Sequence, residues 1–190
     1  MKAGKNPFRT ERLMQVRYRL HGASWVALLQ RFEQFRFRGA IIGRHGSGKT
    51  TLLEDVGARL RRSGLSTQFL RLDADQRTFP KGFMEDLAAT LGPNDILLFD
   101  GAEQLAWAAW LWFRWRTRRA GGLLITTHRP GRLPTLWECR TSPELLRSIA
   151  AELLGRGEHG LTHQAQTLHA AHAGNLRDAL REWYDIYAAA

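Results

Sequence analysis

The residues between Gly43 and Thr50, Gly-Arg-His-Gly-Ser-Gly-Lys-Thr, have the types and spacing that bind phosphate groups. They follow the pattern G-x-x-x-x-G-K-[S/T], in which glycines let the backbone wrap around phosphate oxygens with its N–H groups pointing inward. Lys49 would contact the terminal phosphates, and the Thr50 hydroxyl would bind Mg²⁺. The pattern predicts a phosphate-binding loop made of consecutive residues: Gly43, Arg44, His45, Gly46, Ser47, Gly48, Lys49, Thr50 and Thr51.

A candidate metal ligand follows the apolar run 96–99, which predicts a buried strand. Asp100 stands at the carboxyl end of that strand, and in a parallel sheet this end lies beside the phosphate-binding loop. We therefore expect Asp100 to hold Mg²⁺ through water, although an Asp here could also cap a helix. Glu103 is either the carboxylate that orients the attacking water or an ordinary acid in the first turn of a helix.

A third candidate is the polar end of the apolar strand expected over 122–127. Thr127 or its neighbours Thr126 and His128 could hydrogen-bond the γ-phosphate or its attacking water. The alternative is a strand end that turns into a Pro-Gly loop.

The segment 173–187 predicts an amphipathic helix with Asn175 as its N-cap. Its apolar face has helical spacing and consists of Leu176, Ala179, Leu180, Trp183 and Ile186 or Tyr187. Arg177 lies off that face. If the helix folds over the carboxyl edge of the sheet, Arg177 can meet the γ-phosphate; otherwise it is a solvated arginine.

Strands and helices must alternate to position these residues. The expected strands are 38–42, 67–72, 95–100, 122–127 and a short one near 137–140. The expected helices are 23–35, 50–62, 82–92 with Gly92 as C-cap, and 102–118. Residues 14–20 predict a strand or an extended arm. Strands separated by helices of this length indicate a parallel sheet with crossover helices.

The pattern becomes entirely helical after Ser142, which is typical of an N-cap and is followed by Pro143 and the acidic Glu144. We expect an N-terminal arm and helix over 1–36, an α/β core over 37–141 and a helical lid over 142–190.

These residues together resemble the AAA+ class of P-loop ATPases, particularly the bacterial branch with transposition and secretion ATPases. The resemblance implies a three-layer P-loop core with a small helical lid, and ATP and Mg²⁺ as cofactors. By position, it implies a Walker A motif at 43–50, a Walker B acid at Asp100, the sensor 1 region at Thr127 and a sensor 2 arginine at Arg177. Gly101 departs from the pattern, because many hydrolysing relatives carry Glu there. The candidate catalytic residues are Lys49, Asp100, Glu103, Thr127 and Arg177.

A rival resemblance comes from His128 after the strand LLITT, which is similar to the switch histidine of ABC ATPases. No LSGGQ-like signature stands between Lys49 and Asp100, however. No NKxD motif follows a strand, which favours ATP over GTP.

Composition limits the partners and the compartment. The chain has 190 residues with 28 Lys and Arg against 18 Asp and Glu, so its formal charge is +10. This charge favours polyanions: nucleotides, nucleic acid or acidic proteins. The single cysteine, Cys139, excludes an internal disulfide and fits a reducing compartment. No apolar run is long enough to span a bilayer, and the first residues lack the apolar core of a signal peptide. We expect a cytoplasmic protein.

Two clusters allow a functional and a structural interpretation. Four tryptophans on the helix expected over 102–118 alternate with arginines near its end and could stack on nucleic acid; the alternative is a core helix with cations at its C-terminus. They are Trp107, Trp110, Trp112 and Trp115, followed by Arg114, Arg116, Arg118 and Arg119.

Four histidines near the C-terminus predict a solvated helix face rather than a metal site. They are His159, His163, His169 and His172.

The sequence therefore predicts an ATP- and Mg²⁺-binding P-loop protein, an ATPase that hydrolyses slowly and switches a partner interaction. One alternative is a nucleotide or small-molecule kinase, for which the loop HRPGRLP is the only segment resembling a mobile lid. Another is a DNA-associated adaptor in which ATP has a structural role.

Overall fold

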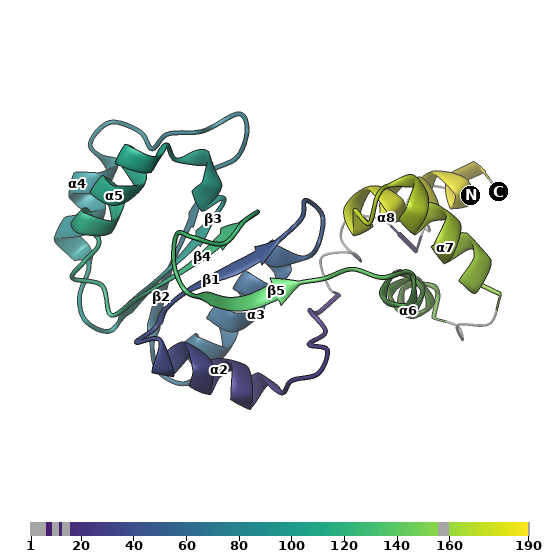
Figure 1. Cartoon of the computed structure of the whole chain (residues 1–190), viewed down its shortest axis with the longest axis horizontal. Coiled ribbons are helices and arrows are strands. Elements are labelled where there is room, and N and C mark those ends of the chain that lie inside the picture. Colours follow the sequence, from purple (N-terminus) through teal and green to yellow (C-terminus); the bar gives the residue numbers. More distant parts are fainter. Residues whose placement is uncertain (1–6, 9–11, 13–15, 156–159, 190) are drawn as a thin grey trace. The chain divides into compact units, whose positions relative to one another are not determined.

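The computed structural model describes residues 7–8, 12, 16–155 and 160–189, which form two compact units. The sheet unit comprises residues 19–43 and 49–138. The helical unit comprises residues 44–48 and the described residues of 1–18 and 139–189. The sheet and helices α2 to α5 belong to the first unit, and α6, α7 and α8 belong to the second (Figure 1).

The sheet unit is an α/β structure with a parallel sheet, which confirms the prediction made from the alternation of strands and helices. Its strands lie in the order β2-β3-β4-β1-β5. β1 pairs with β4, and β3 pairs with β2 and β4, all in parallel. The carboxyl ends of β1, β4 and β3 are therefore neighbours at one edge. The strands are β1 Arg38–Gly43, β2 Ser66–Arg71, β3 Asp95–Asp100, β4 Gly122–Thr127 and β5 Thr135–Cys139.

Helices cover both faces of this sheet, an arrangement compatible with a three-layer α/β fold (Figure 1). Strand side chains alternate between the faces, so Leu98 and Phe99 point in opposite directions. Phe99 packs on Phe113 of α5, whereas Leu98 lies against Gly57 of α3. Because both faces are covered, β4 is buried along its whole length. The helices of this unit are α2 Trp25–Gln34, α3 Lys49–Arg62, α4 Phe83–Thr90 and α5 Trp107–Arg116.

The prediction of one long helix over 102–118 is wrong, because this segment forms two separate elements. A short 3₁₀ helix, η2 (Ala102–Gln104), is followed by two extended residues and then by α5. Leu105 has φ −71° and ψ 133°, and its carbonyl oxygen accepts a hydrogen bond from Arg132 Nη2 at 2.5 Å. A distant arginine thus binds a carbonyl that a continuous helix would use internally.

Two other local predictions differ from the structure or extend beyond it. Helix α4 ends at Thr90 with the extended Leu91 as its C-cap, so Gly92 is not the cap. Instead, the Gly92 N–H donates to Asp95 Oδ2 at 2.7 Å, in the turn that leads into β3. In the segment predicted as a strand or an extended arm, residues 16–20 form no helix or strand, and residues 14 and 15 lie outside the described residues.

The helical unit contains α6 Pro143–Leu154, α7 Thr162–Ala171 and α8 Leu176–Ala189. Both predicted N-caps are confirmed: the Ser142 hydroxyl accepts from the Leu145 N–H, and Asn175 Oδ1 accepts from the Asp178 N–H, each at 3.2 Å. Trp183 of α8 is fully buried and stacks on Phe8, with their ring centroids 5.5 Å apart.

No described helix of either unit is both long and apolar enough to cross a lipid bilayer.

Candidate nucleotide-binding site

The predicted phosphate-binding loop starts where β1 ends and stops where α3 begins, which is the strand–loop–helix context that the motif requires. Gly43 is the last residue of β1, and Lys49 is the first of α3. Lys49 is buried as a residue, and its Nζ donates a hydrogen bond to the Gly43 carbonyl oxygen at 2.9 Å. This bond joins the two ends of the loop and holds a cation at the carboxyl edge of the sheet.

The side chains of the loop differ in their surroundings. Arg44 and His45 are exposed, so they can meet a ligand from solvent. Ser47 is buried, and its hydroxyl has no hydrogen-bond partner within the described chain. Thr51 follows in the first turn of α3 and is half-buried.

Gly46 and the start of α8 belong to the same unit and lie in close contact. Gly46 has φ +70°, and a Cβ added there would collide with the side chain of Asn175. Arg177, the predicted sensor arginine, lies two residues after Asn175 in the first turn of α8 and is exposed.

Asp100 is the centre of a buried hydrogen-bond network at the ends of β3 and β4. The Thr50 hydroxyl donates to Asp100 Oδ2 at 2.9 Å, and the Thr126 hydroxyl donates to Asp100 Oδ1 at 2.7 Å. Thr126 in turn accepts the N–H of Gly101 at 2.8 Å. Both carboxylate oxygens are therefore fixed, and the predicted metal residues Thr50 and Asp100 are in direct contact although 50 positions separate them.

The oxygen donors at this edge fit a magnesium ion. Mg²⁺ is bound by hard oxygen ligands, usually one or two protein groups together with substrate phosphates and water. The Thr50 hydroxyl and the Asp100 carboxylate are such groups. Arg71, at the end of β2, brings its Nε to 4.0 Å from Asp100 Oδ2, and its side chain is about half exposed. This arginine places a positive charge beside the carboxylate.

The predicted sensor residue Thr127 makes a different contact from the one expected. Its hydroxyl donates to the Arg129 carbonyl oxygen and accepts the Arg129 N–H at 3.2 Å. The side chain is therefore engaged in the turn after β4. Because successive strand residues point to opposite faces, Thr126 and not Thr127 faces Asp100.

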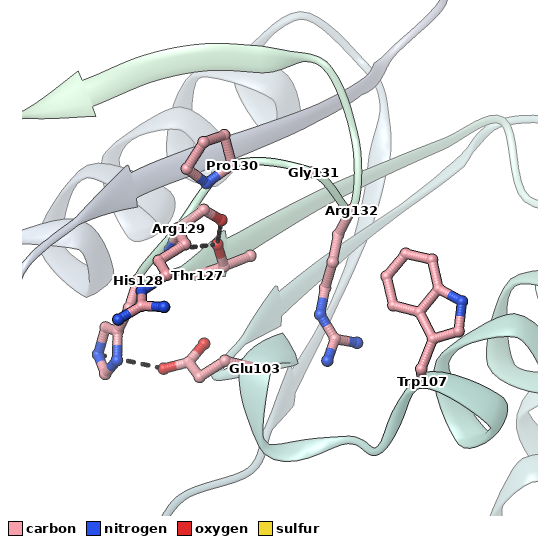
Figure 2. Close-up of a pocket in the computed structure, with 8 residues that line it drawn as sticks. All are labelled: Glu103, Trp107, Thr127, His128, Arg129, Pro130, Gly131 and Arg132. Atoms are coloured by element: carbon pink, nitrogen blue, oxygen red, sulfur yellow. Dashed lines mark hydrogen bonds and ion pairs between the residues drawn. The ribbon is translucent and has the colours of Figure 1, made fainter.

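A pocket of about 280 Å³ opens beside this edge, between η2 with the start of α5 on one side and the loop after β4 on the other (Figure 2). Its walls are Glu103, Trp107, Thr127, His128, Arg129, Pro130, Gly131 and Arg132.

Glu103 and Arg132 give the pocket its chemical character. Glu103 Oε1 lies 3.3 Å from His128 Nε2, as Figure 2 shows, whereas its buried Oε2 has no hydrogen-bond partner among the described residues. The guanidinium of Arg132 stacks near Trp107, and its buried Nη1 likewise lacks a hydrogen-bond partner there. Burial lowers the pKa of Arg132, and the nearby Glu103 carboxylate partly offsets that effect. Glu103 Oε2 can therefore accept a hydrogen bond from a polar ligand or water, and Arg132 Nη1 can donate one.

Gly101, where many AAA+ ATPases carry a glutamate, has a structural reason to be glycine. Its φ is +82°, and a Cβ at this position would collide with the Leu72 carbonyl oxygen. A glutamate therefore cannot stand directly after Asp100 without moving the backbone, which leaves Glu103 as the nearest following carboxylate in the sequence.

The histidines near the C-terminus do not form a metal centre in the described part of the chain, where no group of three His, Cys, Asp or Glu residues converges. His172 Nε2 lies 2.6 Å from Glu182 Oε2, and His169 Nε2 lies 3.4 Å from the Thr141 hydroxyl. His159 is outside the described residues.

Compared with models of known protein families and with curated protein sequences, the chain matches none of them.

Sequence reasoning named Thr126 only as a possible contact of the γ-phosphate and not as the partner of Asp100. It missed Arg71 beside that acid and the place of Arg132 in the pocket. Thr126 and Arg71 stand at strand ends, which was the available signal, but strand register decides which end residue faces Asp100; Arg71 pairs with Asp100 in that register. Arg132 stands in the loop HRPGRLP, which the sequence indicated only as a possible mobile lid, because its contacts with Leu105 and Trp107 depend on how that loop folds.

Proposed function

We propose that this chain is an AAA+-like P-loop NTPase that binds ATP with Mg²⁺, hydrolyses it slowly and uses the cycle to switch a partner interaction. The observation that carries this proposal is the hydrogen bond from Thr50 to Asp100. It joins the last residue of a phosphate-loop motif to a buried acid at the end of another parallel strand, where such folds bind phosphorylated ligands.

The residues would divide the work as follows. Backbone N–H groups of the loop 43–51 would bind the phosphates, with Lys49 on the terminal ones. Thr50 and Asp100 would hold Mg²⁺, which when bound supplies charge neutralisation on the phosphoryl oxygens. Thr126 keeps the Asp100 carboxylate in one orientation.

The position of Glu103, the candidate base, supports the proposal that hydrolysis is slow. Glu103 is three residues from Asp100 and shares its carboxylate with His128, so it would orient water less directly than a glutamate at position 101. Thr127 would support the turn that carries His128. Arg177 would be the arginine that contacts the γ-phosphate.

The proposed setting is the cytoplasm, a reducing compartment that fits a chain with a single cysteine. The proposed partner is nucleic acid or an acidic protein, because the chain carries a net charge of +10.

Nucleotide binding by Lys49→Ala tests the proposal. Removal of this charge-assisted bond to the phosphates should weaken ATP·Mg²⁺ binding by more than tenfold, about 1.4 kcal/mol, in titration calorimetry. Lys81→Ala is the matched control, since Lys81 is exposed in the loop before α4 and should leave affinity unchanged. Unchanged affinity in a folded Lys49→Ala protein would contradict the phosphate-loop assignment.

The metal assignment needs a separate measurement. Asp100→Asn keeps the shape of the side chain but removes its charge, so the gain in ATP affinity on adding Mg²⁺ should largely disappear. A variant that keeps the full Mg²⁺ dependence would place the metal elsewhere.

Phosphoryl transfer to a small molecule is the second candidate function. The pocket beside Glu103 favours it, because an acceptor hydroxyl could donate to Glu103 Oε2 and accept from Arg132 Nη1. A kinase would form ADP without an equal amount of free phosphate when a mixture of nucleosides and sugars is added. An ATPase would release the two in equal amounts.

A further inference from the structure

Helix α5 carries more exposed large hydrophobic side chains than any other described helix. The described residues include seven large hydrophobic side chains that are exposed, and four of them belong to this ten-residue helix. They are Trp107 at 58%, Leu111 at 48%, Trp112 at 46% and Trp115 at 55% exposed, here called the aromatic face of α5. These four side chains are not part of the hydrophobic core, because Trp110 and Phe113 are the residues by which this helix packs into it. A concentration of exposed indoles of this kind marks an interaction surface.

Arginines lie against the same rings. The guanidinium of Arg116 is 6.0 Å from the Trp112 ring centroid and 5.9 Å from that of Trp115. Arg118 lies 4.7 Å from the Trp115 centroid. Together with the exposed Arg114 and Arg119, these residues form a positive cluster at the end of α5. Within the described chain, none of these four arginines forms an ion pair with an acidic side chain. Their charge is therefore available to an anionic partner.

We propose that the aromatic face of α5 and its arginines bind single-stranded nucleic acid, with bases stacked on the indoles and phosphates bound by Arg116 and Arg118. Proteins that bind single strands combine such stacking platforms with cationic contacts to the backbone. The binding itself is inferred from α5 alone; only its role as the partner interaction switched by ATP rests on the proposed function.

A duplex and a membrane fit these observations less well. The faces of bases are stacked inside a duplex, so exposed indoles can reach them only in an unpaired strand. A helix that binds a membrane surface separates its apolar face from its cationic face. On α5 the guanidiniums lie over the rings themselves, so insertion of Trp112 and Trp115 would carry Arg116 toward the acyl chains.

The first test measures binding of a fluorescent oligo-dT of about 15 nucleotides, within the known range of single-strand site sizes. The measurement is made without ATP, so its outcome is separate from that of nucleotide binding. Trp115→Ala should weaken binding at least fivefold, as the loss of one base–aromatic stack requires. Trp115→Phe keeps a ring and should retain most of the affinity, which separates stacking from a general effect of substitution. Equal affinity of Trp115→Ala and the parent would overturn the proposal.

The second test separates specific arginines from overall charge. Arg116→Gln/Arg118→Gln should flatten the dependence of log K on log salt by up to about 1.4, or about 0.7 for each phosphate that the variant no longer neutralises. The control Arg61→Gln/Arg62→Gln removes the same charge from α3, on the opposite face of the sheet, and should change the slope little.

Three results would contradict the proposal: equal slopes in the two double variants, tighter binding to duplex than to single strand, or binding to phosphatidylserine vesicles without binding to oligo-dT. The last result would indicate a membrane-binding surface on this chain instead.

Discussion

Gly101 shows how a single residue limits the chemistry of this site. A side chain there meets the Leu72 carbonyl oxygen, and the backbone has φ +82°, a conformation that costs a non-glycine residue about 1–3 kcal/mol. The position directly after Asp100 is therefore closed to the glutamate that many P-loop ATPases carry there.

Replacement of Gly101 by alanine should lower the free energy of unfolding, measured in urea, by more than the strain alone. Gly64→Ala is the matched control, because Gly64 has a similar φ of +88° but no atom within 4 Å of an added Cβ. Equal destabilisation of the two variants would show that the backbone near Leu72 yields easily, and that the absence of glutamate has another cause.

Glu103 has two alternative roles: it orients the attacking water, or it is a structural residue of η2. If it orients the attacking water, Glu103→Gln should reduce ATP turnover by at least about tenfold at unchanged ATP affinity, since general bases contribute about 10²–10⁴ in rate. Glu85→Gln, in the exposed first turn of α4, is the control. Turnover equal to that of the parent would return Glu103 to the structural role.

At the scale of an element, α5 has two apolar sides, one packed in the core and one exposed to solvent. Trp110 is fully buried against Phe113 and the sheet, whereas Trp112 points outward and is 46% exposed. The periodicity of the sequence could not separate them, because tryptophan occupies both sides of the helix.

The two sides should separate in unfolding experiments. Trp110→Ala should destabilise the protein by about 3–5 kcal/mol, because it leaves a cavity in the core. Trp112→Ala should change stability by less than about 1 kcal/mol. Urea midpoints with unchanged m-values measure both effects, and a large destabilisation by Trp112→Ala would assign the outer side to the core as well.

At the scale of the whole molecule, the proposed switch requires that ATP binding and nucleic-acid binding affect each other. Trp107 belongs to the aromatic face of α5 and also to the pocket wall, where Arg132 lies between it and Glu103 (Figure 2). A strand bound on α5 would therefore touch the wall of the pocket next to the candidate base.

Affinity for oligo-dT should consequently differ between the ATP-bound and the empty protein, by about 5–150-fold if the coupling is of ordinary size. Lys49→Ala, whose ATP affinity should be more than tenfold lower, is expected to show no difference at an ATP concentration that saturates only the parent protein. Equal affinity of the parent protein with and without ATP would indicate incidental charge attraction rather than a switch.

Local patterns predicted most of the elements, because their signals are contained in a few neighbouring residues. The N-caps Ser142 and Asn175 and the buried strand before Asp100 follow from side-chain chemistry or apolar periodicity alone. The helix over 102–118 failed for the opposite reason, since the break at Leu105 depends on a hydrogen bond from Arg132, 27 residues away.

The sequence by itself determined the phosphate-loop motif, the alternation of strands and helices, and the acid at the end of a buried strand. Each is a matter of residue type and short spacing. Only the tertiary structure decided that Thr126 and not Thr127 binds Asp100, that Arg71 lies beside that acid, and which tryptophans of α5 face outward. These facts depend on strand order, register and helix packing, and no short stretch of the chain contains them.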